Sequence, residues 1–96
     1  MEQLERIKAM EQALDSVTAA VVALCEAAEK YSAVQEQLQE LTAYYKGGQW
    51  RQDYEDDCAG KLPTDLKRGV LSEDAVYDLL AEHDRLMERL RELTQI

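Results

Sequence analysis

The chain has few of the residues that end helices or build sheets. Its 96 residues include no phenylalanine, one proline and four glycines. No glycine or proline occurs between Leu4 and Tyr45, and all five lie in residues 47–69. Alanine, leucine, glutamate and glutamine are abundant, and this composition favours helix over sheet. The sequence therefore predicts an all-α protein whose helix breakers are confined to one central segment.

Basic residues are also scarce, at 11 against 20 acidic ones, for a net charge of −9. Direct nucleic-acid binding needs surplus lysine and arginine, so it is not expected. No membrane association is expected either, because the longest apolar run, residues 19–25, is far below the roughly 20 residues of a bilayer span. The N-terminus does not resemble a secretory signal. Cys25 and Cys58 have no metal-ligand spacing with His83, which predicts reduced thiols, a cytoplasmic location and no cofactor.

The first half of the chain predicts one long helix, over about residues 3–46. Apolar residues recur three and four positions apart, as in a helix that packs along another helix. After Tyr31 the row slips by one position and continues from Val34, a three-residue stammer expected to overwind the helix without breaking it. A fold-back near Tyr31 is the alternative. Gly47 is the expected left-handed residue after the last turn. The row comprises Ile7, Met10, Leu14, Val17, Val21, Leu24, Ala28 and Tyr31.

A second helix is predicted over about residues 72–95. Ser72 is placed to cap its free N–H groups, and Leu71 and Val76 have the spacing of a hydrophobic staple. Its expected apolar row is Val76, Leu79, His83, Leu86, Leu90 and Leu93, widened by Leu80 and Met87.

The connection, residues 47–71, is too long for a tight hairpin loop and is expected to be structured. Trp50, Tyr54 and Cys58 lie four apart, which predicts a short helix ended by Gly60. A further helical turn is expected from Pro63 to Gly69. The predicted fold is a single helical domain over residues 1–96, a long antiparallel helical hairpin or coiled-coil-like bundle with one or two short helices in its connection.

The unequal lengths of the two long helices predict a homodimer. At about 1.5 Å per residue the first is roughly 60 Å long and the second roughly 36 Å. The N-terminal part of the first row then has no partner within the chain, and such a stripe usually contacts another subunit. The candidate dimer seam is Ile7, Met10, Leu14, Val17 and Val21.

Four carboxylates cluster in the connection and raise the possibility of a Ca²⁺ or Mg²⁺ site. They are Asp53, Glu55, Asp56 and Asp57. An EF-hand loop starting at residue 53 would need Gly at position 58 and Glu at position 64, and the chain has neither. The connection also carries nearby basic residues, so internal ion pairs are the favoured interpretation, with a metal site as the alternative.

Five of the six aromatic residues lie in or beside the connection, namely Tyr44, Tyr45, Trp50, Tyr54 and Tyr77. They predict a small satellite core, with a partner-binding face as the rival hypothesis. No nucleophile accompanies the single His83, so no catalytic site is predicted. The candidate interaction surface is Tyr45, Trp50, Tyr54, Asp57, Lys67 and Arg68.

Residues Tyr44–Leu80 resemble the signature of a family of small bacterial proteins, domain of unknown function 4298. The matching parts are the tyrosine pair before a glycine, the tryptophan, DYEDD, AGKLP, DLKRGVLSED and YDLL. An acidic residue is more usual in that family where this chain has Cys58, which argues against a thiol-based role, and Gly48 also departs from the pattern. The resemblance implies a bacterial, cytoplasmic origin and transfers no activity, cofactor or catalytic residue.

The sequence thus favours a non-enzymatic helical protein–protein interaction module whose partners are a second copy of itself and a further protein. Two alternatives stay open. One is a metal- or small-ligand-binding protein that uses the acidic cluster at residues 53–57. The other is an acidic mimic of nucleic acid that inhibits a DNA-binding protein, since the charge of −9 resides on the helices.

Overall fold

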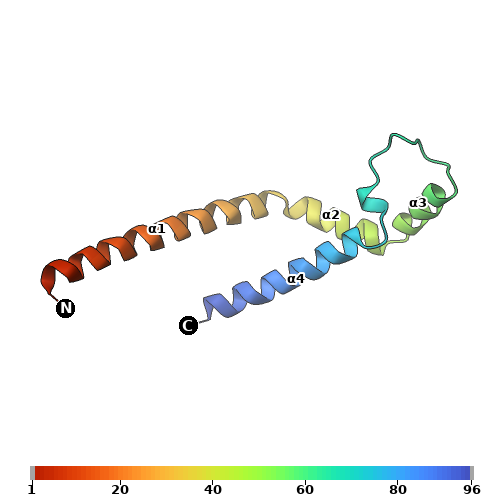
Figure 1. The fold of residues 1–96 in the computed structure, drawn as a ribbon. Helices are drawn as coiled ribbons and strands as arrows, with labels where there is room; N and C mark the ends of the chain where they lie inside the picture. The colour runs from red at the N-terminus through yellow and green to blue at the C-terminus, as the bar shows by residue number, and fades with distance from the viewer. Residues whose placement is uncertain (1, 96) are drawn as a thin grey trace. The chain divides into compact units, whose positions relative to one another are not determined.

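The computed structural model describes residues 2–95, and these residues form helices and no strand. The expected all-α class is therefore confirmed (Figure 1). The described chain separates into two compact units, one up to Glu36 and one from Gln37 onward. The single helical domain expected over residues 1–96 stays a prediction. The elements are α1 (Gln3–Ala33), α2 (Gln35–Lys46), α3 (Gln49–Cys58), the 3-10 turn η1 (Gly69–Leu71) and α4 (Ala75–Thr94).

The first long helix is interrupted at Val34, so the expectation of an unbroken helix over 3–46 was wrong at one residue. Val34 has φ −107° and ψ 12°, and its N–H donates to the carbonyl oxygen of Tyr31 at 3.2 Å. The Gln35 side-chain amide donates to the same carbonyl oxygen at 3.4 Å. The break coincides with the slip in the apolar row, where two three-residue steps follow one another. Each such step turns the row back by about 60° on a helix of 3.6 residues per turn.

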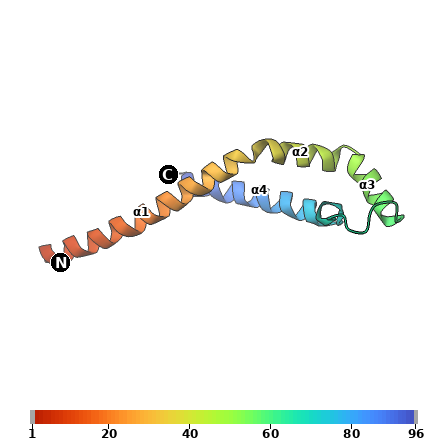
Figure 2. The same cartoon turned by 90° about the horizontal axis from the view of Figure 1, so that it is seen from above.

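In the second unit, α3 turns away from α2 at the two adjacent glycines, and α4 runs back alongside α2 in the opposite direction (Figure 2). Gly48 has φ +89°, while Gly47 is not left-handed, which corrects the position expected for the left-handed residue. A Cβ at Gly47 would lie 2.8 Å from the Ala43 carbonyl oxygen. The two glycines are therefore needed for different reasons, Gly47 for close backbone approach and Gly48 for its dihedral angles.

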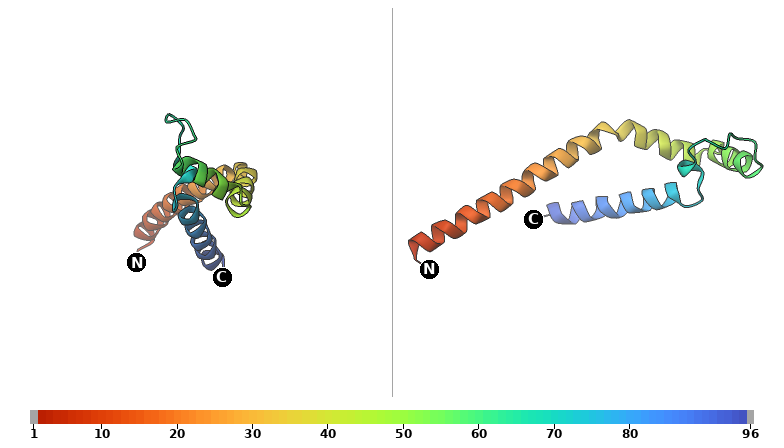
Figure 3. Two further views of the ribbon diagram at one scale, coloured as in Figure 1. Left: turned by 90° about the vertical axis from the view of Figure 1, so that its right-hand side faces the viewer. Right: turned by 45° about the horizontal axis from the view of Figure 1, so that its top comes forward.

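Between α3 and α4 the chain makes a loop that returns to η1. Gly60 has φ +74° and ends α3 as expected. The helical turn expected from Pro63 to Gly69 is confirmed only at its start: the Leu66 N–H donates to the Pro63 carbonyl oxygen at 3.3 Å, but no helix forms there and the 3-10 turn η1 lies at Gly69–Leu71. Figure 3 (right) shows η1 between α3 and the first turn of α4.

The start of α4 is fixed by the Ser72 hydroxyl and two buried side chains. The Ala75 N–H donates to Ser72 Oγ at 3.2 Å, so Ser72 binds a free N–H group as predicted. The helix itself begins at Ala75, and its N-cap residue is Asp74, whose side chain makes no cap bond. Leu71 and Val76, the expected staple pair, are buried at 7% and 3% exposure. The less exposed stripe of α4 is Val76, Leu80, Ala81, His83, Met87 and Leu90. Leu79, Leu86 and Leu93 are instead about half exposed or more, so that part of the expected row was wrong.

Candidate functional site

Trp50 is the centre of the connection. It is the second residue of α3, is 9% exposed, and donates its indole N–H to the carbonyl oxygen of Val70 at 2.7 Å. Its ring stacks on Tyr54 with centroids 5.1 Å apart and meets Tyr45 edge-on at 5.2 Å. The helical spacing of Trp50 and Tyr54 brings the second ring against the first, as the sequence predicted. These contacts form the small aromatic core expected for the connection.

Two tyrosine hydroxyls bind carboxylates, one joining α2 to α3 and one joining α3 to the turn before α4. Tyr44 donates to Asp53 Oδ2 at 2.6 Å, and Tyr54 donates to Glu73 Oε1 at 2.5 Å. Burial, followed by the bond to Asp53, raises the pKa of Tyr44 to about 12. The bond to Glu73 is the largest cause that raises the pKa of Tyr54 to about 12. Both phenols therefore act as hydrogen-bond donors at neutral pH.

Arg68 holds the loop between α3 and η1 together. Its Nε donates to Asp57 Oδ1 at 2.7 Å. One terminal nitrogen donates to the carbonyl oxygens of Thr64 at 3.1 Å and Leu66 at 3.0 Å, and the other donates to that of Pro63. The guanidinium thus satisfies backbone carbonyls that no helix or sheet satisfies. The Arg68 guanidinium is therefore engaged within the loop.

The four carboxylates of the acidic cluster serve separate contacts. Asp53 binds the Tyr44 hydroxyl, Asp57 pairs with Arg68, and Asp56 accepts from Gln52 at 3.1 Å and lies 3.8 Å from Lys61 Nζ. Glu55 is exposed. The predicted ion pairs within the connection are confirmed. Across residues 2–95, no group of three or more His, Cys, Asp or Glu side chains is arranged to hold a metal ion.

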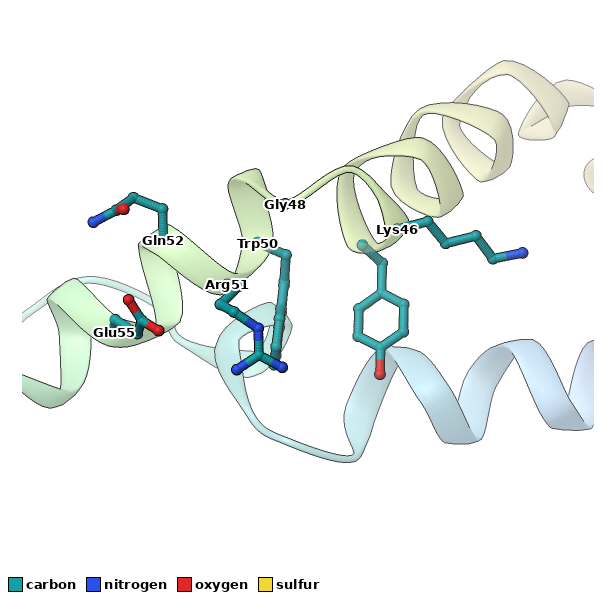
Figure 4. Close-up of a pocket in the computed structure, with 7 residues that line it drawn as sticks. Lys46, Gly48, Trp50, Arg51, Gln52 and Glu55 are labelled. Carbon is teal, nitrogen blue, oxygen red and sulfur yellow. The ribbon is translucent and has the colours of Figure 1, made fainter.

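A cavity of about 490 Å³ opens where α2 joins α3. Trp50 and Arg51 point to the same side of it, whereas Lys46 points away from both (Figure 4). The cavity therefore presents one guanidinium beside an aromatic wall, and its two cations do not converge. Its lining is Tyr45, Lys46, Gly48, Trp50, Arg51, Gln52 and Glu55.

The remaining sequence candidates lie outside this core. Tyr77 is 63% exposed and is not part of the aromatic cluster, which corrects its expected place. Lys67 is exposed. Cys25 and Cys58 are both free and exposed. His83 is partly buried, with Nδ1 3.4 Å from Asp84 Oδ1.

The candidate dimer seam on α1 is exposed along its whole length. No residue of α1 is buried. Six aliphatic side chains at alternating three- and four-residue spacing keep 49–61% of their surface exposed. We call them the α1 row: Ile7, Met10, Leu14, Val17, Val21 and Leu24.

Sequence reasoning missed five hydrogen-bond acceptors in or beside the connection. Glu73 accepts from Tyr54 across 19 residues of sequence, and the Val70 carbonyl accepts from Trp50 across 20. The carbonyls bound by Arg68 belong to irregular backbone. Residue type shows that Trp50, Tyr54 and Arg68 need acceptors, but it does not show which backbone carbonyl or distant carboxylate provides them.

Comparison with known proteins gives one match. A family model described as domain of unknown function (DUF4298) matches residues 7–93, which confirms the resemblance found in the sequence. No curated protein and no solved structure matches the chain. None of the helices in the described range combines the length and apolarity that a bilayer crossing requires.

Proposed function

The chain belongs to the family of domain of unknown function 4298, and we propose that it is a non-enzymatic helical interaction module that forms a homodimer. The α1 row carries this proposal. Its six side chains recur with the heptad spacing of helices that pack along one another. Each is about half exposed or more. Such a stripe on an acidic protein usually contacts another subunit.

The exposed area of the row supplies part of what a pair of chains needs. Full burial of a large aliphatic side chain contributes about 1.5–3 kcal/mol at about 25 cal/mol per Å², which corresponds to roughly 60–120 Å². Because each member of the row is 49–61% exposed, it offers about half of that area, and six members in each of two copies give about 400–800 Å². The residues that flank the row therefore have to contribute as well to reach the about 1,200 Å² of the smallest specific interfaces. A second copy is a natural partner because its row has the same repeat.

The polar groups of the connection support a non-enzymatic role. The polar side chains bind one another in pairs: Tyr44 with Asp53, Tyr54 with Glu73, and Arg68 with Asp57. These are the titratable groups that the sequence gathers in one place, and they serve to hold the connection. We also assign the chain to the cytoplasm, since two free, exposed thiols suit a reducing compartment.

Light scattering coupled to gel filtration tests the proposal. The wild-type chain is expected to elute with the mass of two copies, and Val17→Glu is expected to convert it to one copy by burying two charges in the pair. Ala19→Glu is the matched control, because it adds the same charge two residues away on the opposite side of α1 and should leave the dimer intact. A wild-type monomer at every concentration, or a dimer that survives Val17→Glu, would overturn the proposal.

A further inference from the structure

The two flanks of the α1 row differ in chemistry. In the heptad notation of coiled coils, Ile7, Leu14 and Val21 occupy a positions, and Met10, Val17 and Leu24 occupy d positions. The g positions on one flank are all alanine, whereas the e positions on the other carry an acid, a hydroxyl and a thiol. The g residues are Ala13, Ala20 and Ala27, and the e residues are Glu11, Thr18 and Cys25.

The relative direction of the two helices decides whether the two flanks of the pair differ. In a parallel pair, each flank combines g residues of one helix with e residues of the other, so the two flanks are the same. In an antiparallel pair, g faces g along one side and e faces e along the other. Small residues at a helix contact allow the backbones to approach closely, and axial separation depends on the side chains present. Only the antiparallel pair places the alanines opposite one another and the polar residues together.

The order of side-chain sizes along the row favours the same direction. Leu14, Val17, Val21 and Leu24 read the same in reverse about Ala19. In an antiparallel pair centred there, Val17 faces Val21 of the second copy and Leu14 faces Leu24. The same register places the long Met10 opposite the small Ala28, which continues the row. A parallel pair would instead place two copies of Ala28 together, and such a void costs stability.

Electrostatics favours the antiparallel pair as well. Antiparallel helices place opposite ends of their macrodipoles together. A parallel pair would gain one contact, between Arg6 at a g position and Glu11 at the following e position of the second copy. Exposed ion pairs of that kind contribute about 0–1 kcal/mol. One weak pair does not outweigh packing along the whole row.

We propose that α1 pairs antiparallel with α1 of a second copy, centred on Ala19, with Ala13, Ala20 and Ala27 forming the close flank. This rests on the proposed homodimer and specifies its partner, direction and register. In this arrangement Glu11 of one copy lies next to Cys25 of the other, twice per dimer. Within one chain, or in a parallel in-register pair, residues 11 and 25 are separated by about 21 Å along the helix.

The native thiol of Cys25 makes this testable with one introduced thiol on an exposed position. Glu11→Cys in a Cys58→Ser background is treated with a short bismaleimide and run on a denaturing gel. A cross-linked dimer is expected, and it should be lost when Cys25→Ser is added. The parallel reporter is Leu14→Cys with Cys25→Ser and Cys58→Ser, whose thiols face each other only in a parallel in-register pair and lie about 15 Å apart in the antiparallel one.

The possible results separate this inference from the homodimer on which it rests. Cross-linking of the Glu11→Cys chain through Cys25 supports the antiparallel register. Cross-linking of only the Leu14→Cys chain overturns the direction while the homodimer stands. A dimer by light scattering that gives neither product overturns the α1 register, and a monomer at every concentration overturns both proposals.

Discussion

Replacing Trp50 with phenylalanine tests whether the second unit is organised around this one side chain. Phenylalanine keeps an aromatic ring against Tyr54 but has no donor for the Val70 carbonyl, which Trp50 binds at 2.7 Å. This bond is only partly buried, and the loss of a typical hydrogen bond costs about 0.5–1.5 kcal/mol. The smaller ring also removes packing at a site that is only 9% exposed. We expect a loss of about 2 kcal/mol in the free energy of unfolding.

That loss is large for a unit of this size. At about 0.05–0.15 kcal/mol per residue, a helical unit of some 60 residues has roughly 3–9 kcal/mol in total. The melting temperature should fall by roughly 10 °C. Urea unfolding measures the loss in the free energy of unfolding. Far-UV circular dichroism is the signal to follow, because the variant lacks the chain's single tryptophan and therefore its fluorescence. Tyr77→Phe, at a side chain 63% exposed, should change stability by less than about 0.5 kcal/mol. A Trp50→Phe midpoint equal to that control would refute the reasoning.

Two further predictions concern the loop and its neighbouring helix. Arg68→Lys removes the planar guanidinium that binds Asp57 and three backbone carbonyls. The loop should then be held less tightly, and trypsin should cleave faster at Lys61 and Lys67. An unchanged cleavage rate would contradict this role of Arg68. Burial and the bond to Asp53 raise the pKa of Tyr44 to about 12, against about 10 when unfolded, so its stabilisation is complete below pH 10 and is lost as pH rises from 10 to 12. Urea midpoints across that window should fall less steeply for Tyr44→Phe, and an equal slope would count against the bond.

The regular elements could be predicted because their signals are local. Apolar spacing and the absence of glycine and proline predicted the helices, and Ser72 predicted the start of α4 through a hydrogen bond within four residues. The slip in the apolar row after Tyr31 also marked the place where the helix is interrupted. Whether a helix overwinds or breaks at such a slip depends on contacts with other helices, which the local sequence does not show. A stammer is absorbed by overwinding when a partner helix holds it, whereas here the chain turns at Val34 with a bond to Tyr31.

The site was less predictable because its bonds cross long stretches of sequence. The aromatic spacing on α3 correctly brought Tyr54 onto Trp50. Nothing local indicated that Arg68 would bind the backbone of residues 63–66, so a further helical turn was expected there. An arginine with five donors can replace the internal hydrogen bonds of a helical turn, and the loop then needs no regular structure.

The two glycines between α2 and α3 meet different requirements. The sequence predicted left-handed backbone angles at Gly47, but the structure has them at Gly48, and Gly47 is needed for close backbone approach. Gly48 has φ +89° with open space around it, so asparagine, which tolerates left-handed angles, should restore much of the stability that Gly48→Ala loses. At Gly47 the obstacle is the Ala43 carbonyl oxygen, 2.8 Å from an added Cβ, so Gly47→Asn should destabilise as much as Gly47→Ala. Each alanine variant is expected to cost about 1 kcal/mol or more in urea unfolding. If asparagine restored stability at position 47 and not at position 48, the left-handed residue would be Gly47, and its assignment to Gly48 would be wrong.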